Sequence, residues 1–128
     1  MILTNGRVPQ TAQALSEVMS DLRAQPHVLL ASLSTADGVP VDLTENKASQ
    51  LSAVAGFLLA AAQQSCTMLG LEESAEVMIQ GQKGHVLVMR PFTVAQTRVI
   101  LTIIFSEETT YRRLFNTAVR AVQQVMEA

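Results

Sequence analysis

Residues 48–71 read ASQLSAVAGFLLAAAQQSCTMLGL, and these twenty-four consecutive positions carry no charged side chain. Their hydrophobic spacing predicts a helix, closed near Gly70, because glycine readily adopts the left-handed conformation that ends helices. A helix on the surface of a soluble monomer normally turns Lys and Glu side chains to water. This helix has no such face, so we expect its own domain to cover one side and a partner to cover the other.

The helix divides into two stripes at about 3.6 residues per turn. The stripe expected to face the core consists of Leu51, Val54, Ala55, Leu58, Ala62, Cys66 and Leu69. The opposite stripe is small rather than polar and contains Ser49, Ala53, Gly56, Ala60 and Thr67. Glycine inside a helix costs about 1 kcal/mol relative to alanine, and close backbone packing is a reason to tolerate it. We therefore expect Ala53, Gly56 and Ala60 to meet another helix, with Phe57 beside the contact.

Two other interpretations of this helix stay open. It could be a central helix wrapped within one domain, although a chain of this size rarely has enough layers. It could also cross a membrane, since the run exceeds the roughly 20 residues that a bilayer requires. However, its uninterrupted apolar part spans only residues 53–62, and the N-terminus MILTNGRVPQ lacks the apolar region of a signal peptide. We expect no membrane span and a cytoplasmic location.

Composition favours a single domain with an apolar interface. The chain has 128 residues, of which 48% are hydrophobic and 16% charged, a composition richer in core-forming residues than an average soluble domain. The net charge of −2 provides no basic surface for nucleic acid. Cys66 is the only cysteine, and neither His27 nor His85 has a second ligand at metal-binding spacing. We expect no disulfide, metal or cofactor.

The remaining elements follow from periodicity and turn residues. An amphipathic helix begins near Pro9 and stops before Pro26, and a later one begins near Thr109. Five strands are expected, at residues 27–34, 39–44, 76–80, 85–90 and 98–105. Asp37-Gly38 marks the first hairpin, and the short later connections require antiparallel pairing. The prediction is an α+β fold of order α-β-β-α-β-β-β-α with a five-stranded antiparallel sheet, in which residues 1–8 form a tail and 9–128 one domain.

No sequence pattern supports catalysis. The turn GQKG at residues 81–84 lacks phosphate-loop spacing and joins two strands. The carboxylate pairs Glu72-Glu73 and Glu107-Glu108 lie at element boundaries, where structural roles suffice. No nucleophile, base and oxyanion donor appear in recognisable order. We expect that the chain is not an enzyme.

The order of elements and three stretches resemble the Roadblock family, which includes the Roadblock-type dynein light chains and bacterial and archaeal relatives. The stretches are VLLASLSTADGVPV at 28–41, ASQLSAVAGFLLAAAQQSCTML at 48–69 and EVMIQGQKGHVLVM at 76–89. The likeness extends over about residues 12–126 and implies a Roadblock-like fold with profilin- and longin-like layering. The turn PFTVAQT at 91–97 departs from the family, where a Gly-rich turn is common.

The resemblance implies a homodimer in which the helices at 48–69 pack together and the strands at 76–80 join the two sheets. The interface would contain Ala53, Gly56, Phe57, Ala60, Val77 and Ile79. Bacterial relatives bind small Ras-like GTPases and alter their nucleotide cycle, which implies a non-catalytic regulator here. The expected GTPase contacts lie near Lys47, Phe57, Gln63 and Gln64. Alternatives are a dimeric scaffold or light-chain subunit that ignores nucleotide state, and a small-molecule sensor.

Overall fold

The structure is a computed structural model that describes residues 7–42 and 46–127, with side chains from residue 11 and from residue 48 onward in these two parts. In chain order the elements are α1 (Arg7–Arg23), β1 (Val28–Thr35), α2 (Asn46–Leu69), β2 (Val77–Gln80), β3 (Val86–Val94), β4 (Thr97–Phe105) and α3 (Arg112–Met126). The strands form one antiparallel sheet in the order β1-β4-β3-β2. The α+β class expected from the sequence is confirmed.

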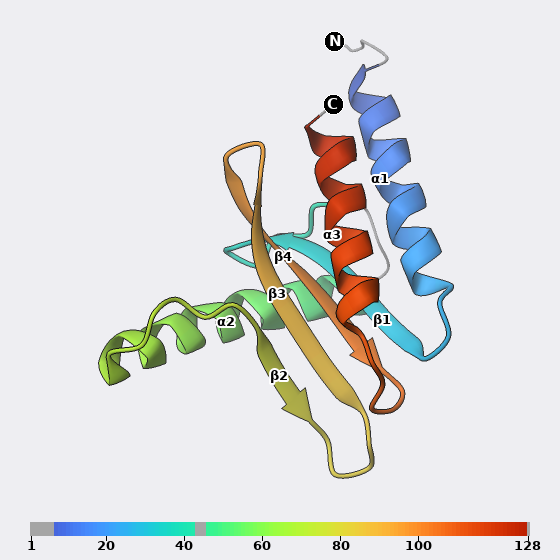
Figure 1. Ribbon diagram of the computed structural model, residues 1–128. Coiled ribbons are helices and arrows are strands. Elements are labelled where there is room, and N and C mark those ends of the chain that lie inside the picture. The colour runs from blue at the N-terminus through green and yellow to red at the C-terminus, as the bar shows by residue number, and fades with distance from the viewer. Residues whose placement is uncertain (1–6, 43–45, 128) are drawn as a thin grey trace.

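The sheet is covered on both faces, by α1 and α3 on one side and by α2 alone on the other (Figure 1). The larger core lies beneath α1 and α3, where the fully buried Met19, Leu33, Phe105 and Phe115 meet. The smaller core lies beneath α2 and consists of Ala55, Leu59, Met89 and Ile100. Alternation along the strands produces this division, because successive side chains point to opposite faces of a sheet.

The sheet has four strands in the described part of the chain, so the predicted five-stranded sheet is wrong. The stretch expected as a second strand makes only an isolated bridge, Ser34↔Pro40, and a hydrogen bond from Val41 N–H to the Leu33 carbonyl. Pro40 has no N–H to continue a ladder, and Asp42 turns inward to accept a hydrogen bond from Arg23 Nη2 at 3.0 Å. The rest of this predicted strand, at 43–44, lies outside the described residues.

The hairpin of β3 and β4 is longer than predicted. Strand β3 continues past Arg90 through Pro91 to Val94, and β4 starts at Thr97. Proline is tolerated because β2 pairs with β3 only as far as Met89, so Pro91 has β4 as its single neighbouring strand. The turn between the strands places Ala95 at φ 48° and Gln96 at φ 66°, which is unfavourable for both residue types.

Helix α3 begins at Arg112 rather than near Thr109, and the residue before it is Tyr111. The Tyr111 ring lies between two buried aromatics, with its centroid 5.7 Å from Phe105 and 5.8 Å from Phe115. Aromatic packing therefore fixes where α3 starts, without a side-chain cap. At the other end of the chain, α1 already includes Arg7 and Val8, while the remainder of the predicted tail, 1–6, lies outside the described residues.

Candidate interaction surface

Helix α2 binds the sheet through one narrow face of its first half. Ala48, Leu51, Ser52, Ala55 and Leu59 are buried along this face. From Gln63 onward no residue of the helix is buried, and α2 extends beyond the sheet (Figure 1). Its last turns have little tertiary cover and contain hydrogen bonds from Ser65 Oγ to the Ala61 carbonyl and from Thr67 Oγ1 to the Gln63 carbonyl.

Gly56 belongs to the covered face and contacts the chain's own turn, which corrects its assignment to an intermolecular contact. A Cβ atom on Gly56 would lie 2.7 Å from the Gly38 nitrogen and 2.8 Å from the Asp37 carbonyl carbon. Gly38 itself has φ +89°, and a Cβ there would lie 3.0 Å from the Ser52 carbonyl oxygen. The helix and the turn after β1 thus touch backbone to backbone. The close approach predicted for Gly56 exists, but within the domain.

The outer face of α2 carries the apolar surface. Ala53, Phe57 and Ala60 are exposed, and the Phe57 side chain is 72% accessible. Val54 at 45% and Met68 at 78% extend the same face, which has no charged residue from Ala48 to Leu69. An exposed apolar face of this length marks an interaction surface.

The predicted core stripe of α2 is partly wrong. Val54 and Leu69 were expected inside, yet both are exposed, Leu69 at 73%, and Leu59 is buried in their place. Periodicity gives the angle between side chains but not the direction from which the sheet approaches. Because the helix extends past the sheet, Leu69 and the half-buried Cys66 also lie where the domain provides little cover.

Strand β2 is an open edge beside this helix. It pairs with β3 through Val77↔Met89 to Gln80↔Val86 and is the last strand of the sheet. Val77 packs against the small core beneath α2, and Ile79, two residues on, is 47% exposed. An unpaired edge with apolar side chains is a template for strand addition.

The predicted contact residues therefore fall into three groups. Ala53, Phe57 and Ala60 lie together on the outer face of α2, and Val77 with Ile79 lies on the β2 edge. Gln64 is exposed and Gln63 half-buried in the extension of α2. The Lys47 side chain lies outside those described. Sequence reasoning missed the exposure of Val54, Leu71 and Met78. For Val54, only the direction of the sheet beneath α2 could have revealed it.

Several ionisable groups make structural contacts. Glu76 accepts hydrogen bonds from Arg90 Nη2 and Tyr111 Oη, each at 2.9 Å. Burial and, next, the hydrogen bond to Glu76 raise the pKa of Tyr111 above its usual value of 10.0. Within the described residues, no three His, Cys, Asp or Glu side chains converge as metal ligands.

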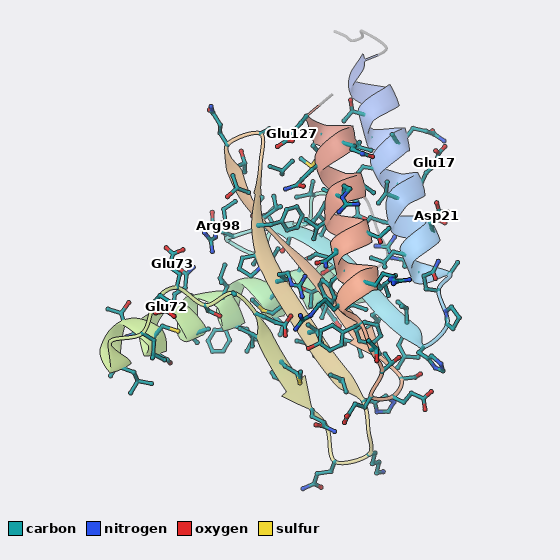
Figure 2. All side chains as sticks on the ribbon, in the orientation of Figure 1. Glu17, Asp21, Glu72, Glu73, Arg98 and Glu127 are labelled. Atoms are coloured by element: carbon teal, nitrogen blue, oxygen red, sulfur yellow. The ribbon has the colours of Figure 1, made fainter. Side chains whose placement is uncertain are left out.

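The predicted carboxylate pairs lie apart and face different partners. Glu73 meets Arg98 at 3.4 Å, as Figure 2 shows beside α2, whereas Glu107 meets His27 at 2.9 Å. Glu108 accepts a hydrogen bond from Gln80 Nε2. These contacts are largely exposed and stabilise the fold only weakly. They bring no acid and base together around one cavity.

Helix α2 is also the one helix of the described chain that is long and apolar enough to cross a bilayer, over Ala48–Leu69. The core helix of a soluble protein has the same composition. Here the inner face of its first half packs on the sheet, with Ala55 and Leu59 buried against Met89 and Ile100.

Comparison with known proteins agrees with this architecture. The family model of the Roadblock/LC7 domain matches residues 14–105. A gliding protein MglB from Thermus thermophilus is similar in structure, with a TM-score of 0.72 and 17% identity over 99% of this chain and 96% of that one. MglB of Myxococcus xanthus has a TM-score of 0.66 and 17% identity, covering 99% of this chain and 95% of that one.

A Roadblock/LC7 domain from Streptomyces avermitilis has a TM-score of 0.68 and 19% identity, covering 85% of this chain and 92% of that one. At these identities the solved structures establish a common fold, and no curated protein sequence matches the chain at a significant level. The family model spans β1, α2 and the whole β2–β4 meander, which are the elements that build the surface described above. The chain belongs to the Roadblock/LC7 family.

Proposed function

We propose that this chain is a non-catalytic regulatory module that forms a homodimer and binds a small Ras-like GTPase in the cytoplasm. The observation that carries the proposal is the exposed, charge-free outer face of α2, centred on Phe57. A face without charge is poorly suited to water and well suited to an equally uncharged counterpart. A second copy of the same helix offers that counterpart in a two-fold contact.

The dimer contact is proposed to combine the outer face of α2 with the β2 edge. Ala53 and Ala60 permit two helices to approach closely, and Phe57 supplies the large apolar group between them. Val77 and Ile79 lie where a second β2 strand would pair, which would close the open edge of the sheet. Gly56 takes no part, because the turn at Gly38 already covers it.

The GTPase is proposed to bind across the paired helices, near Lys47, Phe57, Gln63 and Gln64. The exposed extension of α2 supports this position, because its glutamines and Met68 offer polar and apolar contacts beyond the sheet. Family likeness supports the class of partner. The exposed, uncharged face of α2 supports a binding role for the domain rather than a chemical step.

The experiment is a pull-down from native cytosol with the immobilised protein, run in parallel with a non-hydrolysable GTP analogue and with GDP. We expect a small GTPase to be retained in one nucleotide state. The variant Phe57→Glu should lose it, whereas Leu29→Glu, which changes another exposed apolar residue on β1, should retain it. Identical partners in both nucleotide states, with no GTPase among them, would instead assign the dimer to a scaffold or light-chain role.

A further inference from the structure

The outward face of α1 and α3, on the side of the sheet opposite α2, carries separated charges of opposite sign. Glu17 and Asp21 lie one turn apart on α1, each two residues from a buried side chain, Leu15 and Met19, and therefore point away from the core. Both carboxylates lie on the outside of the molecule (Figure 2). This edge of the layer is acidic.

The neighbouring helix presents the opposite charge. Arg113 and Arg120 are exposed on α3, and at about 3.6 residues per turn Arg113 lies on the opposite side of the helix from buried Val122. None of these four charged side chains makes an ion pair inside the part of the chain that the structure describes. The outward face of the layer therefore carries an acidic pair, Glu17 and Asp21, on α1 and a basic pair, Arg113 and Arg120, on α3.

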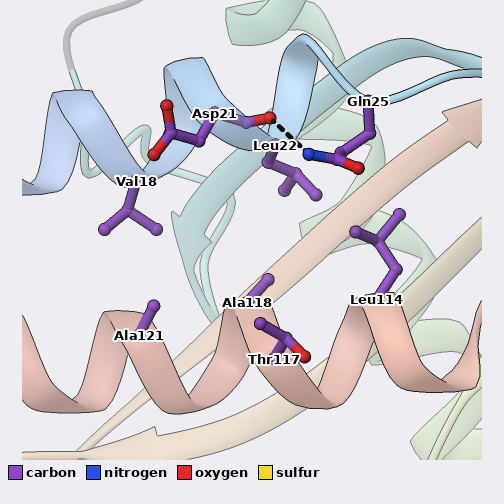
Figure 3. A pocket seen from close by; sticks show the side chains of 8 residues that line it. All are labelled: Val18, Asp21, Leu22, Gln25, Leu114, Thr117, Ala118 and Ala121. Atoms are coloured by element: carbon purple, nitrogen blue, oxygen red, sulfur yellow. Dashed lines mark hydrogen bonds between the residues drawn. The ribbon is translucent and has the colours of Figure 1, made fainter.

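An apolar groove runs between the two charged edges. It has a volume of about 170 Å³ and is lined by side chains from both helices, with Val18 opposite Ala121 and Leu22 opposite Ala118 (Figure 3). Val18, Leu114 and Ala121 are only half-buried, so a covering surface would remove more apolar area from water. The polar rim is formed by Asp21, Gln25 and Thr117.

We infer that this face binds the same face of a second copy of the chain. The helices α1 and α3 run antiparallel side by side (Figure 1). A two-fold axis parallel to them places α1 of each copy over α3 of the other, so that acidic side chains meet basic ones twice. A two-fold axis across the helices would instead place like charges together. The charge pattern thus selects both the partner and the orientation.

This contact is independent of the dimer proposed for α2, since the two faces lie on opposite sides of the sheet and can be occupied at once. The two contacts also differ in their response to salt. The Debye length falls from roughly 10 Å at 0.1 M salt to roughly 3 Å at 1 M, which weakens attraction between exposed charges. The α2 face has no charge to screen.

Sedimentation velocity over a concentration series tests the inference. At 0.1 M salt we expect mass to rise beyond that of the species formed through α2, and at 1 M salt we expect only that species. The variants Arg113→Glu/Arg120→Glu and Glu17→Arg/Asp21→Arg should each lose this association by roughly ten- to hundredfold, because in each variant the side chains at these four positions carry charges of the same sign. Mixing the two variants should restore it, since the acidic layer then faces the basic one.

Lys83→Glu/Arg112→Glu is the matched control, because it changes net charge equally but leaves Arg113 and Arg120 in place. Restoration on mixing also shows that both variants are folded. Failure of the mixture to associate more tightly than either variant alone would overturn the inference. A wild-type mass that does not change with salt would also overturn it. So would wild-type protein that does not self-associate but binds a different protein through this face.

Discussion

Gly56 joins α2 to the rest of the domain through backbone contact alone. Its missing Cβ leaves space for the Asp37-Gly38 turn, whose nearest atom lies 2.7 Å from where that Cβ would be. Helix propensity favours alanine at this position by about 1 kcal/mol, so packing and propensity act in opposite directions. Packing prevails because the opposing atoms are backbone, which cannot rotate away as a side chain can.

Gly56→Ala is accordingly expected to lower the free energy of unfolding by about 1–3 kcal/mol, the usual effect of overpacking. Urea denaturation followed by circular dichroism measures it. Ala12→Ser, on the exposed surface of α1, should change stability by less than about 0.5 kcal/mol. An alanine variant as stable as wild type would show that the turn can shift without loss.

Tyr111 connects the edge strand to α3 and provides a test at high pH. Because its pKa is raised in the folded state, its contribution to stability is complete below about pH 10, the unfolded value, and is lost as pH rises through the higher folded value. Tyr111→Phe removes the hydrogen bond to Glu76 and should lower stability by about 1 kcal/mol at pH 8. The difference between the two proteins should shrink above pH 10 in thermal melts. A constant difference across that range would exclude the raised pKa as its cause.

At the scale of elements, the β3–β4 hairpin has local backbone strain in its turn rather than in its strands. Ala95 and Gln96 both adopt positive φ, a pattern typical of a two-residue turn that favours Asn-Gly. The Ala95 N–H donates to Glu127 Oε2 at 3.0 Å, so the end of α3 helps to hold the turn. Long, well-paired strands thus impose their geometry on a turn of unsuitable sequence.

Ala95→Asn/Gln96→Gly should therefore raise the free energy of unfolding by about 0.5–1 kcal/mol, since both residues tolerate positive φ and the donated N–H is retained. Thermal melting at fixed concentration measures the gain. The control Thr93→Asn/Arg98→Gly places the same residues in the paired strands and should destabilise instead. No gain in the turn variant would mean that the observed φ values carry little strain.

Most elements could be predicted from sequence because period and turn residues are local properties. They predict the helix at 48–69, the three later strands and the end of the helix at Gly70. Gly70 has φ +72°, the left-handed conformation expected there. Other features depend on what lies across the fold. The start of α3 depends on the aromatic contacts of Tyr111. The strand predicted after Gly38 is absent because Asp42 turns to Arg23. The burial of Gly56 depends on a turn 18 positions earlier in the chain. The helix that carries the candidate surface was predicted, and Ala53 and Ala60 of its predicted outer stripe are exposed. The positions assigned wrongly are Gly56, which is buried, and Val54, which is exposed.

At the scale of the whole molecule, the two faces of the sheet are covered unequally. Two helices and the larger core lie on one side, while α2 alone, over a core of four buried residues, lies on the other. The β2 edge is open in the described part of the chain, and Val77 on this edge packs against the smaller core. If two copies join there, as proposed, folding and association are coupled, and the melting temperature must depend on protein concentration.

Wild-type protein is expected to gain about 1.4 kcal/mol of dimer stability for each tenfold increase in concentration. Ile79→Lys, which places a charge at the β2 edge, should abolish the concentration dependence. Leu29→Lys, a similar change on β1, should preserve it. Differential scanning calorimetry over two decades of concentration makes the comparison. Concentration-independent melting of the wild type would argue against any obligate contact at this edge.

The extension of α2 beyond the sheet has a consequence for cooperativity. A helical segment with little tertiary cover is marginal in water, because its stability must come largely from its own short-range bonds. From Gln63 to Leu69 no residue is fully buried, and the bonds of the segment include those of Ser65 and Thr67 to carbonyls one turn back. Its amides should exchange with solvent at a lower opening free energy than those beneath Leu59. A partner that covers the extension would raise that local free energy toward the global value and convert a frayed end into part of one folding unit.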